Sequence, residues 1–166
     1  MTLKNRLAAD EPAGPPFQLR LNLHQHILVV DDDEDIRRLN AEALVSSGYQ
    51  VDTAVDGARA WDALQIESYD LLLTDYGMPQ VNGLNLIKKM RAAHMTIPVI
   101  LVSGTVLTEE LTHPRVRIDV MLRKPYTLDE LLASVRKVLH APRPQIRKNG
   151  RPLNGSSRLL KKLTLK

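Results

Sequence analysis

Short apolar runs alternate with longer amphipathic segments between residues 26 and 140. Most of the runs are nearly continuous in apolar side chains, which is typical of strands buried on both faces of a parallel sheet. The runs predict strands at residues 27–30, 51–55, 71–74, 98–102 and 120–122.

The amphipathic segments predict a helix after most of these strands, because apolar residues recur in them at helical spacing. The first helix is expected to end at Gly48, and the last to begin with a capping box from Thr127 to Glu130 and to end before Pro142. The second and third helices are expected over about 56–67 and 83–93. The residues expected to face the core include Ile36, Leu39, Ala43 and Leu44, then Ala60, Trp61 and Leu64, then Leu84, Ile87 and Met90.

Alternating strands and helices of this kind predict an α/β fold, a doubly wound parallel five-stranded sheet with helices on both faces. Ligands of such sheets bind beyond the carboxyl ends of the strands, at the point where the strand order reverses. The first and third predicted strands are expected to flank that point.

Carboxylates follow two of the predicted strands. Asp31, Asp32 and Asp33 come directly after the first, and Asp75 ends the third. In neighbouring parallel strands these groups would meet in one crevice, where like charges need a cation. Oxygen ligands suit a hard ion such as Mg²⁺, which completes its shell with water and phosphate oxygens. The pattern therefore predicts a site for phosphate chemistry.

Length and composition indicate one compact domain: the chain has 166 residues, of which 43% are hydrophobic. The absence of cysteine excludes disulfides, thiolate catalysis and zinc-thiolate sites. No apolar stretch is long enough for a signal peptide or a membrane span. We therefore expect a cytoplasmic protein without a transmembrane segment.

The net charge of +4 is unevenly distributed. Residues 26–140 carry more acidic than basic side chains, whereas residues 141–166 carry eight basic side chains and no acidic one. We expect a flexible N-terminal extension over residues 1–25, a folded domain over residues 26–140 and a flexible basic tail over residues 141–166. Binding to nucleic acid is therefore expected only through the tail, if at all.

Four motifs appear in order along the folded part, and together they resemble the receiver domain of two-component response regulators. They are ILVVDDDEDIR, LLLTDYGMPQVNG, VILVSG and LRKPY, which begin at residues 27, 71, 99 and 122. The resemblance covers residues 26–140 and is to stand-alone, chemotaxis-regulator-like receivers. It implies a (βα)5 fold with the flavodoxin-like strand order 2-1-3-4-5.

The resemblance also implies roles for individual acidic residues. Asp75 corresponds to the phosphoacceptor, and Asp31 and Asp32 to the acidic pair that organises Mg²⁺. The backbone carbonyl of Gly77 corresponds to a further metal ligand, beside Asp75 itself. Such a domain is a phosphoacceptor that catalyses its own phosphorylation, and possibly its dephosphorylation, rather than an enzyme acting on other substrates.

Lys124 and Ser103 match the remaining lysine and hydroxyl positions of the family. Lys124 can pair with a phosphoryl oxygen as a point charge, and Ser103 can donate a hydrogen bond to another. The implied phosphodonor is a sensor histidine kinase or a histidine phosphotransfer protein. The implied output is altered binding of a downstream protein that the sequence does not identify.

Two alternatives remain at this point. A haloacid-dehalogenase-type phosphatase would use Asp31 as its nucleophile, followed by Ser103 and Lys124, but it would leave Asp75 without a role. A binding module could act through the basic tail, whose lysines and arginines could neutralise phosphates. Asp33, by contrast, is expected only to cap the first helix.

Three positions depart from the family pattern. Met121 stands three residues before Lys124, where the family usually has an aromatic switch residue. Pro114 is expected to shorten or displace the fourth helix. The small-residue pair that often precedes the fifth strand is replaced by Arg117-Ile118-Asp119.

Overall fold

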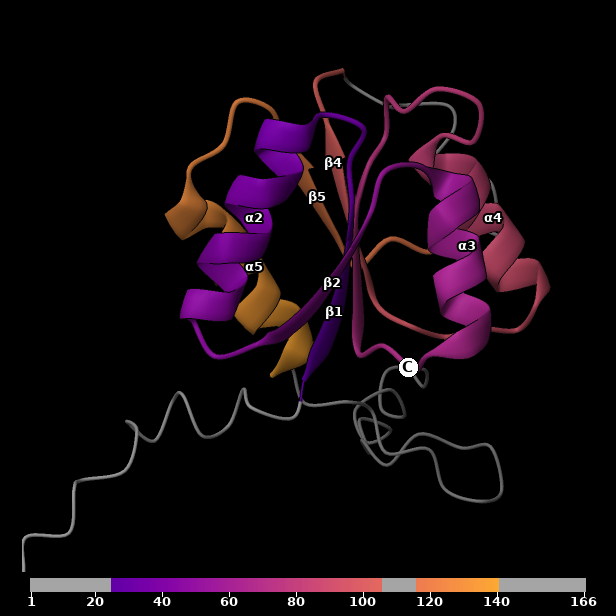
Figure 1. Cartoon of the computed structure of the whole chain (residues 1–166), viewed down its shortest axis with the longest axis horizontal. Coiled ribbons are helices and arrows are strands. Elements are labelled where there is room, and N and C mark those ends of the chain that lie inside the picture. The colour runs from indigo at the N-terminus through magenta and orange to yellow at the C-terminus, as the bar shows by residue number, and fades with distance from the viewer. Residues whose placement is uncertain (1–24, 106–115, 141–166) are drawn as a thin grey trace, which may run out of the picture.

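The computed structural model describes residues 25–105 and 116–140, which form one parallel sheet with helices on both faces (Figure 1). The strands are β1 (His26–Val30), β2 (Gln50–Ala54), β3 (Leu71–Asp75), β4 (Val99–Ser103) and β5 (Val120–Arg123). The helices are α2 (Glu34–Ser46), α3 (Gly57–Ile66), α4 (Gly83–Ala92) and α5 (Leu128–Leu139).

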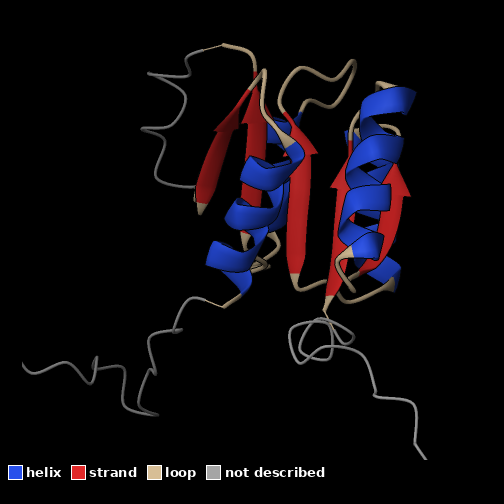
Figure 2. Ribbon diagram, turned by 90° about the vertical axis from the view of Figure 1, so that its left-hand side faces the viewer, coloured by secondary structure: helices blue, strands red, loops and turns tan. Residues whose placement is uncertain are grey.

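The strand order is β2-β1-β3-β4-β5, and every pair is parallel (Figure 2). This confirms the predicted doubly wound order. In the register, Val30 pairs with Thr74, Asp75 with Val102, and Ser103 with Arg123. The carboxyl ends of the three central strands and of β5 therefore lie along one edge, beside the switch point between β1 and β3.

Helices α2 and α5 cover one face of the sheet and α3 and α4 cover the other (Figure 1). The sheet separates two apolar cores, because successive side chains of a strand point to opposite faces. All residues of β3 and β4 are buried. The sheet is thus a rigid platform for the residues that follow the strand ends.

Helix α2 begins as expected, but one of its predicted core residues is wrong. The carboxylate of Asp33 accepts hydrogen bonds from the backbone N–H groups of Asp35 and Ile36, so Asp33 is the N-cap. Leu39, however, is 51% exposed, whereas Asn40 is buried. Residues spaced by four, such as Asn40 and Leu44, lie on one side of a helix, and this side is the one that faces the sheet.

The other helices follow the predicted patterns with small differences. Leu84, Ile87 and Met90 of α4 are buried. Trp61 of α3 is only partly buried, with the Lys89 ammonium 4.3 Å from the centre of its ring. The capping box of α5 is present between Thr127 and Glu130.

The connection between β4 and β5 is described only in part. The predicted fourth helix and Pro114 lie outside the described residues, as do the N-terminal extension and the basic tail. The described end of this connection is tied to the sheet and to α4: the Asp119 carboxylate accepts a hydrogen bond from the Val99 N–H of β4, and the Arg91 guanidinium of α4 donates to the Arg117 carbonyl. Within residues 25–105 and 116–140, the structure has no helix that is both long and apolar enough to cross a membrane.

Candidate functional site

The ends of β1, β3 and β5 bring three predicted site residues together. The Lys124 Nζ lies 2.6 Å from Asp75 Oδ1 and 3.5 Å from Asp31 Oδ2. Both carboxylates are buried, with 6% of Asp75 and 3% of Asp31 exposed, while the lysine side chain is partly exposed. One ammonium group thus bridges two carboxylates that are 44 residues apart in the chain.

The charges in this crevice do not balance. Burial raises the pKa of Asp31, and the charge of Asp75 adds to this effect, against the hydrogen bond from Asp33 N–H and the attraction of Lys124. Burial alone would lower the pKa of Lys124, but its hydrogen bond to Asp75 and the charges of Asp31 and Asp75 outweigh burial and raise it. Lys124 therefore stays charged at neutral pH, and in formal charge the two carboxylates outnumber the one ammonium.

The loop after β3 is built closely around Asp75. The Gly77 N–H donates a hydrogen bond to Asp75 Oδ2, and the Tyr76 N–H donates to the Val102 carbonyl. Gly83, the first residue of α4, packs so closely that a Cβ there would overlap the Asp75 carbonyl oxygen. A glycine is therefore required for α4 to begin directly against the phosphoacceptor candidate.

The acidic segment after β1 is fixed by its own backbone contacts. Asp31 Oδ1 accepts a hydrogen bond from the Asp33 N–H at 3.0 Å, and the Arg37 Nη1 donates to the Asp31 carbonyl at 2.8 Å. Asp32 is exposed, and its side chain takes no part in these contacts. Of the predicted acidic pair, only Asp31 is directed to Lys124.

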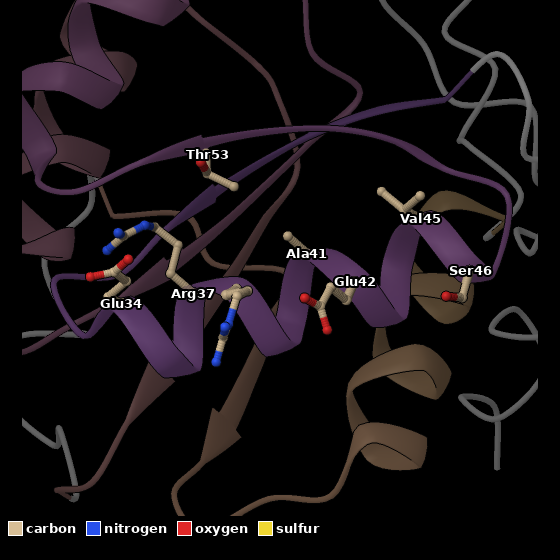
Figure 3. Close-up of a pocket in the computed structure, with 8 residues that line it drawn as sticks. Glu34, Arg37, Ala41, Glu42, Val45, Ser46 and Thr53 are labelled. Atoms are coloured by element: carbon tan, nitrogen blue, oxygen red, sulfur yellow. The ribbon is translucent and has the colours of Figure 1, made fainter.

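Arg37 also lines the hollow drawn in Figure 3, which has a volume of about 470 Å³ and lies between α2 and the edge strand β2. Its side chain reaches back toward Glu34 at the start of the helix (Figure 3). Neither Asp75 nor Lys124 lines this hollow. The hollow is therefore separate from the crevice. Arg37 lines the hollow and contacts the crevice only through its hydrogen bond to the Asp31 carbonyl.

Ser103 ends β4 at the same edge of the sheet, but its hydroxyl group is engaged locally. The Ser103 Oγ donates to the Thr105 carbonyl at 3.0 Å and accepts a hydrogen bond from the Thr105 N–H at 3.2 Å. The residue is buried, with 1% exposed. To serve a phosphoryl oxygen, the hydroxyl hydrogen would have to leave the Thr105 carbonyl, which requires only rotation about the Cβ–Oγ bond.

The donor set of the crevice fits Mg²⁺, which usually takes one or two protein carboxylates and keeps several waters. Asp31 and Asp75 supply buried carboxylate oxygens with only one cationic partner between them. In the part of the chain that the structure describes, no three His, Cys, Asp or Glu side chains are grouped as metal ligands. The fit of Mg²⁺ to this crevice therefore rests on Asp31 and Asp75, whose two carboxylates share only one ammonium.

Comparison with known protein families assigns the chain that forms this crevice to one of them. The sequence pattern of the response regulator receiver domain matches residues 27–136, more than half of the chain. The chain belongs to this family. The match includes the ends of β1, β3 and β5, and the two-component receiver predicted from the sequence motifs is confirmed.

Relatives of this receiver domain include parts of larger signalling proteins. It is 42% identical over 106 residues to the sensor histidine kinase RcsC of Salmonella typhi. This alignment covers 63% of this chain and 11% of RcsC. It is 33% identical over 120 residues to the response regulator MprA of Mycobacterium avium, covering 72% of this chain and 53% of MprA. The chain thus spans about half, or much less, of the curated relatives it matches.

Solved receiver structures share the fold. The receiver domain of the Francisella response regulator 1452 superposes with a TM-score of 0.64 at 29% identity, covering 70% of this chain and 97% of that one. The chemotaxis protein CheY4 of Vibrio cholerae gives a TM-score of 0.64 at 28% identity, covering 69% of this chain and 98% of its own. None of these similarities supports the alternative phosphatase with Asp31 as nucleophile.

Two residues of this receiver site were not predicted from the sequence. Gly83 lies in the MPxxxG stretch after Asp75, and its distance from the aspartate was the available signal. Nothing in the sequence distinguishes Arg37 from an ordinary surface arginine on a helix. Met121, at the usual switch position, lies on β5 with 39% of its surface exposed.

Proposed function

We propose that this receiver domain accepts a phosphoryl group on Asp75 from a sensor histidine kinase or a histidine phosphotransfer protein. The observation that supports it most is the contact of Lys124 Nζ with Asp75 Oδ1 at 2.6 Å, at the switch point of a parallel sheet. A cation in this contact lies beside the oxygen atoms that would attack phosphorus.

The transfer forms a bond from an Asp75 carboxylate oxygen to phosphorus and breaks the phosphorus–nitrogen bond of the donor histidine. A carboxylate nucleophile needs no separate general base. Lys124 can follow the charge from the Asp75 oxygen to a phosphoryl oxygen, since the ammonium is a compact point charge on a flexible stem. Positioning and electrostatic stabilisation then account for most of the rate.

Mg²⁺, when bound, would neutralise charge on the transferred phosphoryl oxygens. Asp31 and Asp75 would hold it through their carboxylates, and the family resemblance adds Asp32 and the carbonyl of Gly77. Asp31 is buried beside Lys124, whereas the Asp32 side chain is exposed and free to turn toward the metal position. The Ser103 hydroxyl would donate to a second phosphoryl oxygen after turning from Thr105.

The output of phosphorylation is altered binding of a downstream protein. Acceptance of a phosphoryl group exchanges the Lys124–Asp75 contact for contacts to phosphate, and this changes the loops at the carboxyl edge of the sheet. The domain that does this spans residues 26–140 and acts in the cytoplasm. Residues 1–25 and 141–166 are an extension and a basic tail outside the phosphorylation chemistry.

Intact-mass spectrometry after treatment with a small phosphodonor and Mg²⁺ tests the proposal. The parent protein is expected to gain one phosphoryl group, and Asp75→Asn to gain none, because an amide is a much poorer nucleophile. Asp62→Asn is the matched control, since this aspartate lies on α3 and is exposed. A phosphorylated Asp75→Asn protein would contradict the proposal.

A further inference from the structure

A polar pair, one member buried and the other partly buried, joins α2 to the loop between β5 and α5. The Asn40 Nδ2 donates a hydrogen bond to the Tyr126 hydroxyl at 2.8 Å, and this hydroxyl donates to the Asn40 Oδ1 at 3.2 Å. The two residues are 86 positions apart in the chain. Each is thus the other's partner across the contact of two separate elements.

This pair is held in one arrangement by the cost of the alternatives. Asn40 is only 3% exposed, and Tyr126 packs against the apolar core between α2, α5 and the sheet. A buried amide or hydroxyl without a hydrogen-bond partner is strongly unfavourable. The amide and the hydroxyl therefore fix the distance between helix α2 and the β5–α5 loop.

Both ends of the pair lead directly to the phosphorylation crevice. Tyr126 lies two residues after Lys124, so its ring anchors the short loop that carries the lysine. Asn40 lies on the helix that follows the acidic segment, one turn after Arg37, whose guanidinium holds the Asp31 carbonyl. The pair thus connects the backbone of the lysine with the backbone of the carboxylates that the lysine bridges.

We propose that Asn40 and Tyr126 are positioning residues that set the Lys124 ammonium against Asp75 and so determine the rate of phosphoryl transfer. The inference rests on the proposed function of Asp75. Neither residue touches the reacting atoms, and both act through the backbone at Lys124. A lysine stem has many rotamers, so the short contact to Asp75 depends on where that backbone is held.

Tyr126→Phe tests the pair with little change in packing, because it removes only the hydroxyl group. The rate of phosphorylation by a small phosphodonor at saturating Mg²⁺ is expected to fall about three- to tenfold, the effect of one lost hydrogen bond. Tyr49→Phe is the matched control. Its hydroxyl is buried without a hydrogen-bond partner among the described residues, so the rate should stay at the parent value.

The same substitution in a Lys124→Ala background separates positioning from a general structural role. If Tyr126 acts through the lysine, Tyr126→Phe should change the remaining rate by less than about twofold there, although it lowers thermal stability equally in both backgrounds. Asn40→Val removes the same hydrogen bonds from the α2 side. It should slow the parent protein similarly, and the double variant should be no slower than either single one.

The inference is overturned if Tyr126→Phe matches Tyr49→Phe in rate, or if it slows transfer by the same factor with and without Lys124. These results leave the proposed function intact as long as phosphorylation still depends on Asp75. Phosphorylation of Asp75→Asn, in contrast, would remove the proposed function and this inference together. Circular dichroism of each variant confirms that the rates come from folded protein.

Discussion

The two ends of the sheet each gather polar side chains. At the amino end a carboxylate lies beside a tyrosine hydroxyl and an imidazole, whereas at the carboxyl end two buried carboxylates share one lysine. At the amino end, the His26 Nε2 lies 3.0 Å from Asp52 Oδ2, and the Tyr69 hydroxyl donates to the same oxygen at 2.7 Å. The imidazole and phenol rings also lie 4.4 Å apart. The Asp52 carboxylate there accepts one hydrogen bond, from Tyr69, and lies beside an imidazole whose Nε2 has no hydrogen-bond partner among the described residues.

At the carboxyl end there are more carboxylates than partners, because Asp31 and Asp75 share the single ammonium of Lys124. Two buried carboxylates with one cation have an excess of formal negative charge that a metal ion can neutralise. Two buried carboxylates with a single lysine between them are a candidate reactive site, whereas the contacts of Asp52 at the amino end hold the strands together. Substitutions at the two ends should therefore affect different properties.

Lys124→Ala is expected to have the largest effect, since it removes the cation of the carboxyl-end crevice. Phosphorylation of Asp75 should slow on the order of 100-fold, the effect of losing one preorganised group that stabilises developing charge. Initial rates with a small phosphodonor measure it. Lys137→Ala, at an exposed position of α5, is the matched control and should leave the rate unchanged.

Asp31→Asn should stabilise the metal-free protein, because it removes a charge that burial disfavours. The pKa of Asp31 is raised in the fold, so the parent's stability is greatest below the unfolded value of 3.8 and declines as the pH rises through the folded value. The asparagine variant does not lose this stability. Its free energy of unfolding at pH 7 in chelator should exceed that of the parent by about 1 kcal/mol.

Chemical denaturation across pH tests this sign. The advantage of Asp31→Asn should disappear below the unfolded pKa, where the parent is protonated in both states, and should narrow when Mg²⁺ stabilises the parent. A variant that is less stable than the parent in chelator at pH 7 would show that Lys124 fully compensates Asp31. The imbalance argued for the carboxyl end would then be absent.

Tyr69→Phe should affect stability alone and by the smallest amount. The substitution removes the hydrogen bond to Asp52 at the amino end, and Asp52 is partly exposed to water. The free energy of unfolding should fall by about 1 kcal/mol or less, with the phosphorylation rate unchanged. A clear slowing of phosphorylation would mean that the two ends of the sheet are coupled, against the separation drawn here.

The sheet and the central part of the site could be predicted because they depend on strand ends. Apolar runs located the strands to within one or two residues, and parallel strands must place Asp31, Asp75 and Lys124 at one edge. The strand positions depend on which residues are buried, and runs of apolar residues in the sequence show this directly. Lys124 reaches both carboxylates across β4, which lies between β3 and β5, so this contact also depends on the length of the lysine side chain.

The rotation of helices and the fine direction of side chains could not be predicted in the same way. Spacings of three and four residues both fit a helix, so Leu39 and Asn40 competed for the same face, and hydrophobicity favoured the wrong one. Asn40 is buried with the Tyr126 hydroxyl as its partner, and the two residues are 86 positions apart in the chain. The bond of Ser103 to Thr105 is likewise set by a loop conformation that no periodic pattern encodes.

Locating the phosphoryl group on the chain distinguishes Asp75 from every other aspartate as the acceptor. After treatment with a small phosphodonor and Mg²⁺, reduction by borohydride converts an aspartyl phosphate to homoserine, and peptide mass spectrometry finds the position. We predict homoserine at position 75 and unmodified aspartate at position 31. Homoserine at position 31, or at any position other than 75, would contradict it.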